Sequence, residues 1–337
     1  MMGENLNRLL VKALPSSVVE ICGSRYIAGR SLSEGIEHMQ KNWEKYRRKS
    51  TFDIIIESVK DKDKADYVLE QYLEAQNLIN KLPVMRGLTY AQMPFSTSVK
   101  PSSICVVKPE DPSYFDPSTP LNARLDRLVQ NSKGIPITLD MENRPFHEVS
   151  YNTVWRQRQQ GVDTFGIVAQ SGYYHTEEFL GRFLEARNPH QGRQRVRLCR
   201  GIYRESREIA TPDKAIAKNL LYELQDLLFE RDAYVEYATH DIPLIQRIMD
   251  YLEQKRISKN RFQFSFLTGV PQVQEEIIPF LDSKGITTEM YVGVELNPGD
   301  ALPYETRRLI ESPDTLISGI KNIFYPVTKL FKKKRLR

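Results

Sequence analysis

Two hydrophobic periods alternate along most of the chain. From about residue 51, short runs rich in β-branched residues are followed by longer runs with apolar residues at helical spacing. The first pair is a predicted strand at 51–59 and a predicted helix at 63–82, whose apolar face includes Val68 and Leu69. This order is typical of βα units.

Seven further strand–helix pairs follow the first. The predicted strands read FSTSVKPSSICVV, PITLDME, TFGIVAQSG, RVRLCRGIY, YVEYATHD, RFQFSFLTG and TTEMYVGVE. The predicted helices after them cover 121–132, 147–160, 176–187, 212–232, 242–256, 271–284 and 303–312. Eight consecutive units predict an α/β fold, a closed (βα)8 barrel of the TIM type. A doubly wound sheet normally has fewer strands and a reversal of winding direction.

The two ends of the chain depart from this repeat. Residues 1–46 predict an N-terminal helical arm, residues 47–326 the barrel, and residues 327–337 a basic C-terminal tail. The tail ends in KKKRLR, and apolar residues precede this run. It fits either a solvated chain end or a peripheral membrane contact, in which apolar side chains enter the headgroup region and cations meet anionic lipid.

Composition and missing motifs exclude several classes of protein. The net charge of +5 comes from interspersed charges, so we expect no nucleic-acid partner. Three cysteines without a CxxC pair and five scattered histidines predict no disulfide framework and no metal site, and they fit a reducing cytoplasm. No P-loop or GxGxxG motif occurs, so a nucleotide cofactor would have to bind the barrel itself.

Polar and ionisable residues gather where the predicted strands end, which is where TIM barrels carry their chemistry. These residues are Glu57, Lys100, Asp140, Glu142, Gln170, Arg197, Arg200, Thr239, His240 and Asp241. Arg197 is the most informative of them, because it interrupts an apolar strand and an unpaired buried charge is strongly destabilising. We therefore expect a buried partner for Arg197.

Two consecutive arginines, Arg307 and Arg308, lie on the last predicted helix. Their side chains project about 100° apart, so they do not share one solvent face. With Lys100 opposite them they would form a site for a small carboxylate, which guanidinium groups bind bidentately. The alternative is an exposed dibasic pair balanced by Glu305 and Glu311.

Two further residues each fit two roles. Lys100 is either a charged residue held by Asp140 or the Schiff-base lysine of a lyase or aldolase, and we prefer the charged form. His240 is either a proton donor or a phosphate ligand.

Six segments resemble motifs of the proline dehydrogenase family, in the family's order. They read SVKPS, ITLDME, IVAQSG, VRLCRGIY, YATHD and PYETRRLIES, and the similarity spans about residues 25–315. The resemblance implies a flavoenzyme that oxidises L-proline, or an analogue such as 4-hydroxyproline, to 1-pyrroline-5-carboxylate. It also implies FAD as hydride acceptor and a membrane quinone as electron acceptor. Such an enzyme would carry out the first step of proline catabolism, in the cytoplasm or at the inner face of the membrane.

The resemblance also implies roles for individual residues. Catalytic roles fall on Asp140 and Arg197, with Arg197 beside the reactive edge of the flavin. The implied substrate-binding residues are Lys100, Arg307, Arg308, Tyr304, Glu311 and Glu57, with Glu57 as an acidic gate that pairs with Arg307. The implied FAD-binding residues are Met141, Gln170, Arg197, Arg200, Gly201, Ile202, Tyr203, Thr239 and His240.

Departures from the family pattern concern the substrate's ring. Where the family carries a ring-packing tyrosine on strand 8, our alignment places Gly293, and an aromatic residue near the end of strand 4 becomes Gly172. These changes predict an enlarged pocket that accepts 4-hydroxyproline, unless Tyr291, Tyr173 or Tyr174 refills the space. Two other functions stay open: a lyase that uses Lys100, and a catalytically degenerate barrel that acts as a binding protein.

Overall fold

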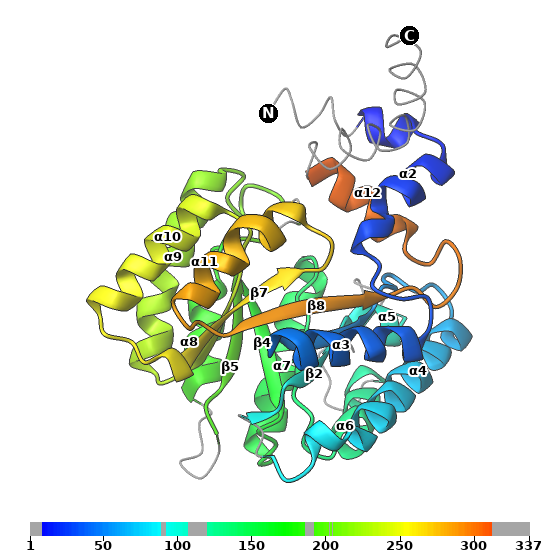
Figure 1. Cartoon of the computed structure of the whole chain (residues 1–337), viewed down its shortest axis with the longest axis horizontal. Coiled ribbons are helices and arrows are strands. Elements are labelled where there is room, and N and C mark those ends of the chain that lie inside the picture. The colour runs from blue at the N-terminus through cyan, green and yellow to red at the C-terminus, as the bar shows by residue number, and fades with distance from the viewer. Residues whose placement is uncertain are drawn as a thin grey trace, which may run out of the picture.

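Eight parallel strands close into one barrel in sequence order. Figure 1 shows the strands in the interior with helices around them. The structure is a computed structural model that describes residues 9–88, 92–106, 120–185, 192–201, 203 and 205–311. The strands are β1 (Lys49–Ile54), β2 (Phe95–Val99), β3 (Ile137–Leu139), β4 (Phe165–Gln170), β5 (Arg195–Cys199), β6 (Tyr234–Ala238), β7 (Phe262–Leu267) and β8 (Thr288–Val294). The prediction of a (βα)8 barrel is therefore confirmed.

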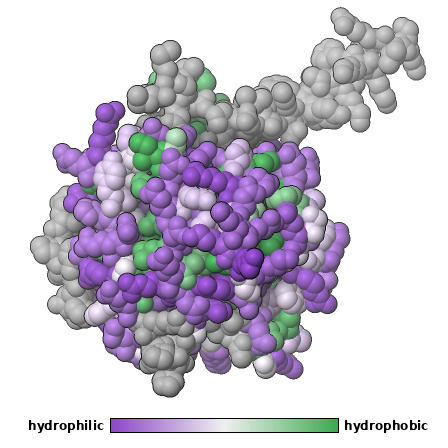
Figure 2. Space-filling view, turned by 90° about the vertical axis from the view of Figure 1, so that its left-hand side faces the viewer, coloured by the Kyte–Doolittle hydropathy of each residue, from purple (hydrophilic) through white to green (hydrophobic). Residues whose placement is uncertain are grey.

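Helices cover the outside of the barrel between successive strands. They are α4 (Lys62–Lys81), α6 (Pro120–Ser132), α7 (Arg144–Gln159), α8 (Thr176–Glu185), α9 (Lys214–Glu230), α10 (Ile242–Gln254) and α11 (Ile278–Ser283). The face seen in Figure 2 is mostly hydrophilic with scattered apolar residues, as expected for amphipathic helices whose apolar sides meet the sheet. The structure also has short elements that were not predicted, among them the single-turn helix α5 (Pro101–Ile104) after β2. The predicted helix at 271–284 is present, but its first part is the π-helical segment η6 (Val273–Ile277) and its second part is α11.

The seam between β8 and β1 is covered by a helix that precedes the barrel. In this seam β1 pairs with β8 from Lys49↔Glu289 to Ile54↔Val294. Helix α3 (Leu32–Tyr46) packs on both strands. A Cβ at Gly35 of α3 would lie 2.4 Å from Val294 and 2.9 Å from Phe52, so only glycine fits this close approach. Helix α3 thus completes the barrel wall, although it lies inside the predicted N-terminal arm.

Helix α12 (Leu302–Glu311), which follows β8, lies near the carboxyl ends of the strands. Its Arg307 reaches Glu57, just beyond β1, and Tyr203, beyond β5. On its other side α12 packs against α2 (Ser16–Gly23), next to which it lies in Figure 1. The contact is apolar around Cys22 and Leu309. The N-terminal arm therefore supports the helix that carries the arginine pair.

A buried carboxyl at this contact makes stability depend on pH. Glu305 of α12 is 2% exposed and lies against Gly23, where a Cβ would come within 2.6 Å of it. Burial raises the pKa of Glu305 from 4.5 to about 7, with the charges of Glu295 and Glu20 adding to the shift. Because the folded chain holds this proton more tightly, the stabilisation is full below pH 4.5 and is lost as pH rises through about 7.

Glu305→Gln is expected to flatten this dependence, because the amide does not titrate. Thermal unfolding at about pH 5 and about pH 8 would measure it, since the variant should lose less of its melting temperature between the two values. The exposed Glu276→Gln serves as control. An unchanged pH slope in Glu305→Gln would contradict the assignment.

Candidate active site

The inner face of the strands carries buried charges instead of the bulky apolar layers usual in such barrels. Six of these residues are at most 7% exposed: Asp53, Lys100, Arg195, Arg197, Glu236 and Glu289. The seventh is Asp140, whose side chain is 14% exposed. They come from β1, β5, β6 and β8 and from the residues that follow β2 and β3. Cations and carboxylates pair with one another in the interior, which makes their burial tolerable.

Arg197 on β5 has the buried partners that its position predicts. Its Nη1 lies 2.9 Å from Asp140 Oδ1 and donates to Ser98 Oγ at 2.9 Å. On the other side, its Nε and Nη2 lie 3.5 Å from Glu236 and 3.9 Å from Glu289. Burial alone would lower the pKa of Arg197, but these carboxylates outweigh it and raise the pKa, so the guanidinium is a fixed cation.

Lys100, which follows β2, has a nearer partner than the one predicted. Its Nζ forms a short ion pair with Asp53 Oδ2, whereas Asp140 Oδ2 is 3.9 Å away. Burial alone would lower the pKa of Lys100, but Asp53 and Asp140 more than offset it and raise the pKa. Because a protonated amine is no nucleophile, this geometry disfavours the Schiff-base alternative.

Asp53 was missed in the sequence, although its signal was present. It is an acidic residue on a strand that otherwise reads as apolar, and it is completely buried. Tyr72 of α4 donates to its Oδ1 at 3.1 Å. Burial raises the pKa of Asp53 to about 6, against the opposing effect of Lys100.

Tyr291 on β8 points into this cluster. Its hydroxyl donates to Asp140 Oδ2 at 2.8 Å and accepts from Lys100 Nζ at 3.3 Å. The Arg197 guanidinium carbon lies 5.5 Å from its ring centre, which is a cation–π distance. Strand β8 therefore does supply an aromatic ring to the catalytic candidates. That ring belongs to Tyr291, two residues before Gly293, where the family's tyrosine was expected.

The space beside Gly293 is already occupied, which counts against the enlarged pocket. A Cβ at Gly293 would lie 2.3 Å from Ile55 Cδ1, so Ile55 already fills the space beside this glycine. The other two candidates for refilling face elsewhere: Tyr173 stacks on His147, and Tyr174 is half exposed. Of the three tyrosines considered for this space, Tyr291 is the one that points into the Asp140 cluster.

Gly293→Ala is therefore expected to destabilise the fold by about 1–3 kcal/mol through overpacking. Adding Ile55→Ala should recover part of this loss, since it removes both atoms that the new methyl group meets. Denaturant unfolding of the two single variants and the double variant measures the coupling. Strictly additive effects would show that Ile55 does not occupy this space.

The arginine pair on α12 spans the mouth of the barrel. Arg307 forms a two-point ion pair with Glu57, with Nη1–Oε1 and Nη2–Oε2 distances of 3.0 and 2.9 Å, and donates to Tyr203 at 3.2 Å. The Arg308 guanidinium lies 5.0 Å from the ring centre of Tyr304. The expected Glu57–Arg307 pair is thus present, and both arginines face the barrel mouth instead of solvent.

Gln170, at the end of β4, has a buried acceptor that no described residue satisfies. Its Nε2 donates to the carbonyl oxygens of Met141 and Glu142 at 2.9 and 3.2 Å, while Oε1 has no hydrogen-bond partner. Gly201 lies above it with φ +90°, and a Cβ there would come within 2.7 Å of Oε1. A buried lone acceptor is costly unless a ligand donor meets it.

His240, which follows β6, is a neutral side chain. Its Nε2 accepts a hydrogen bond from the Leu267 backbone at 3.1 Å, which leaves the proton on Nδ1. Burial, helped by the charge of Arg308, lowers the pKa of His240 to about 4. It is therefore not a cationic acid at neutral pH, and its Nδ1–H is a hydrogen-bond donor. The hydroxyl of its neighbour Thr239 accepts from the Asp241 backbone.

Three predicted features lie outside the described residues. They are Ile202, the side chain of Glu311 and the basic tail at 327–337. Arg200 is described and is partly buried. Burial alone would raise the pKa of Asp241, but the contact with Lys218 and the nearby charge of Arg200 lower it. The predicted residues at the ends of β4, β5 and β6 therefore share one side of the mouth.

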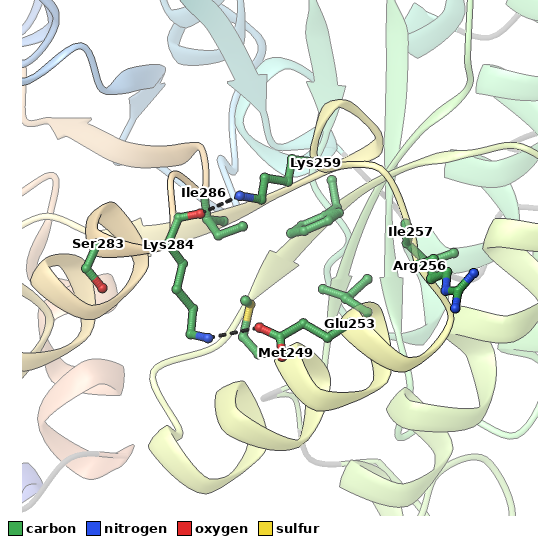
Figure 3. Close-up of a pocket in the computed structure, with 10 residues that line it drawn as sticks. Met249, Glu253, Arg256, Ile257, Lys259, Ser283, Lys284 and Ile286 are labelled. Atoms are coloured by element: carbon green, nitrogen blue, oxygen red, sulfur yellow. Dashed lines mark hydrogen bonds and ion pairs between the residues drawn. The ribbon is translucent and has the colours of Figure 1, made fainter.

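A surface pocket of about 480 Å³ lies at the opposite end of the barrel (Figure 3). It is bordered by α10, α11 and the beginnings of β7 and β8, with Lys284 paired to Glu253 and Lys259 bonded to the Lys284 carbonyl. Because chemistry in this fold sits at the carboxyl ends of the strands, this pocket is not the candidate active site.

The fold and the site together define a TIM-barrel protein whose mouth carries an arginine pair above a buried charged cluster. The chain matches the family model for proline dehydrogenase over residues 36–315. It belongs to the proline dehydrogenase family, oxidoreductases that act on the CH–NH bond of proline.

Individual relatives agree with this assignment. Proline dehydrogenase 1 of Bacillus subtilis (strain 168) is 24% identical over 318 residues, which cover 94% of this chain and 95% of the relative. Proline dehydrogenase of Deinococcus radiodurans is 27% identical over 197 residues, covering 57% of this chain and 58% of that protein.

Solved structures show the same fold. Proline utilization A (PutA) from Bdellovibrio bacteriovorus, inactivated by N-propargylglycine, matches with a TM-score of 0.75 at 20% identity. The match covers 86% of this chain and 32% of that protein, so this chain corresponds to about a third of it. The corresponding match to Bradyrhizobium japonicum PutA has a TM-score of 0.71.

Proposed function

We propose that this protein oxidises L-proline to 1-pyrroline-5-carboxylate by hydride transfer to FAD, the first step of proline catabolism. The observation that carries the proposal is the placement of Arg307 and Arg308 at the mouth, above the buried Lys100–Asp53–Asp140–Tyr291 cluster. A small cyclic amino acid needs such a pairing of a carboxylate anchor with an enclosed reaction site.

The carboxylate end of proline would be held by the arginines. Their guanidinium groups offer paired donors that match a carboxylate, and Lys100 adds a fixed positive charge from below. Glu57 and Tyr203 hold Arg307 in place, and Tyr304 lies against Arg308. Binding energy from this end fixes the position of the ring, where the reaction occurs.

The ring of proline would pack on Tyr291. Because Ile55 fills the space beside Gly293 and Tyr291 points into the Asp140 cluster, we propose L-proline as the preferred substrate over trans-4-hydroxyproline. The kcat/KM for proline should exceed that for hydroxyproline by about tenfold or more. Equal values for the two substrates would restore the enlarged-pocket hypothesis.

The residues at the ends of β4 to β6 fit a flavin cofactor. The buried Gln170 Oε1 needs a donor, Gly201 gives close approach, and the Nδ1–H of His240 is available to a phosphate. FAD, when bound, supplies the hydride acceptor that no side chain provides. Arg197 contributes a fixed cation toward negative charge on the cofactor, and Asp140 orients both Arg197 and Tyr291.

Purified protein tests the proposal directly. It should retain FAD with a visible flavin spectrum, and anaerobic L-proline should bleach that spectrum. Protein that stays colourless after incubation with FAD would overturn the proposal. Borohydride trapping with a carbonyl substrate tests the alternative of a lyase that uses Lys100. Binding of proline without turnover would support a degenerate barrel.

We infer that a membrane quinone accepts the electrons and that the basic tail provides a peripheral contact with the membrane. Among the described residues, no helix has the length and apolar character needed to span a bilayer. Because the tail would meet anionic lipid, deleting residues 327–337 should reduce flotation with anionic liposomes while leaving proline oxidation with a soluble acceptor unchanged. Equal flotation of the two proteins would remove the tail from the proposal.

A further inference from the structure

A second buried carboxylate lies beside the site but touches none of the residues assigned to substrate. Glu142, beyond β3, is 4% exposed. Its Oε2 accepts from the Ser102 backbone N–H at 2.8 Å, and its Oε1 accepts from Ser102 Oγ at 2.5 Å. Ser102 belongs to the single-turn helix α5 and is 2% exposed. One carboxylate thus accepts from both the backbone N–H and the hydroxyl of Ser102.

The same serine holds the loop that follows β1. Ser102 Oγ accepts from the Ser58 backbone N–H at 2.8 Å, and the Ser102 carbonyl oxygen accepts from the Val59 N–H at 3.0 Å. The hydroxyl therefore donates to Glu142 while it accepts from Ser58. With Glu142 ionised, this chain has one direction, because the carboxylate accepts and the Ser58 amide donates. Burial raises the pKa of Glu142 to about 7, against the hydrogen bonds from Ser102, so this arrangement dominates above that pH.

The loop has a strained backbone that needs this support. Ser58 has φ 56°, in the left-handed region that non-glycine residues rarely adopt. The residue before it is Glu57, which makes the two-point ion pair with Arg307. A small change at Ser58 would redirect the Glu57 side chain and, with it, the Arg307 guanidinium.

We infer that Ser102 and Glu142 are positioning residues that set the Glu57–Arg307 pair for the substrate's carboxylate. The chain of contacts runs from Glu142 through Ser102 and the Ser58 amide to Glu57. It connects the ends of β3, β2 and β1 with α12. The inference rests on the proposed function, since it concerns how the enzyme binds its substrate.

The test compares two neighbouring serines of α5. Ser102→Ala removes the hydroxyl that links Glu142 to Ser58. The matched control is Ser103→Ala, which removes an equally buried hydroxyl that donates only within its own turn, to the Lys100 carbonyl. Ser102→Ala should raise the KM for L-proline about fivefold or more and change kcat by less than about twofold, whereas Ser103→Ala should leave both values near wild type.

A double-mutant cycle separates positioning from general damage. If Ser102 acts through Glu57, then Ser102→Ala should raise KM no further in a Glu57→Gln background. Effects that multiply, or a Ser102→Ala variant with wild-type KM, would overturn the inference. If Ser102→Ala does not fold, Glu142→Gln takes its place in the double-mutant cycle, and it should also raise KM.

A binding readout keeps this inference distinct from the proposed function. Cyclopentanecarboxylate has the ring and carboxylate but no amine to oxidise, so calorimetric titration with it reports binding alone. Wild-type protein that neither oxidises proline nor binds this probe would refute the proposed function. Wild-type protein that does both, with unchanged affinity in Ser102→Ala and Glu142→Gln, would refute only the positioning role.

Discussion

Replacing Arg197 with alanine is expected to lower the free energy of unfolding by about 3–5 kcal/mol, because breaking a buried ion-pair network leaves charges without compensation. Three carboxylates share this guanidinium: Asp140, Glu236 and Glu289. In a chain of this size the loss corresponds to a decrease of about 4–7 °C in melting temperature. Thermal unfolding followed by circular dichroism measures it.

Two variants control this experiment. Arg207→Ala removes an exposed arginine from the segment after β5 and should leave the melting temperature unchanged. Arg197→Lys keeps the charge but not the planar fork, so it should fall between wild type and Arg197→Ala. A melting temperature of Arg197→Ala equal to that of Arg207→Ala would show that the network does not stabilise the barrel.

Replacing Arg308 with alanine is expected to weaken proline binding by about 2 kcal/mol or more, through loss of charge-assisted hydrogen bonds to the carboxylate. This free energy corresponds to an increase in KM of about thirtyfold. Steady-state kinetics with L-proline measures the effect. Arg308 also lies close enough to lower the pKa of His240, so removing it should raise that pKa somewhat.

The control for Arg308→Ala is an arginine in an exposed ion pair. Arg127 pairs with Glu70, and both side chains are more than half exposed. Pairs of this kind contribute little. Arg127→Ala should therefore leave KM unchanged. An unchanged KM in Arg308→Ala would refute the assignment of Arg308 to the carboxylate.

The repeat of strands and helices could be predicted because it follows from hydrophobic periods of the chain alone. The predicted helix at 63–82 and the observed α4 (Lys62–Lys81) differ by one residue at each end. The hydrophobic periods do not show where each helix packs on the barrel. Helix α3 covers the β8–β1 seam and α12 lies at the mouth, and both placements depend on contacts between residues distant in sequence, such as Gly35 with Val294.

The candidate site was only partly predictable for a similar reason. Residues at strand ends could be recognised because polar groups interrupt apolar runs there. The pairing between them could not, since Lys100 lies between Asp53 and Asp140 of the two neighbouring strands at distances that depend on strand stagger. Tyr291 and Gly293 both face inward, because side chains alternate along a strand. Only the structure shows that Tyr291, and not position 293, lies at the level of β8 from which a side chain reaches Asp140.

The placement of α3 also constrains how the chain folds. The helix precedes β1 but packs on β8, so the first wall segment made during synthesis meets the last strand made. Until β8 arrives, β1 has an unpaired edge and α3 has half of its packing surface. Closure therefore depends on the most distant pairing in the barrel, which slows folding. A chain that ends before β8 would expose two open strand edges, a template for aggregation.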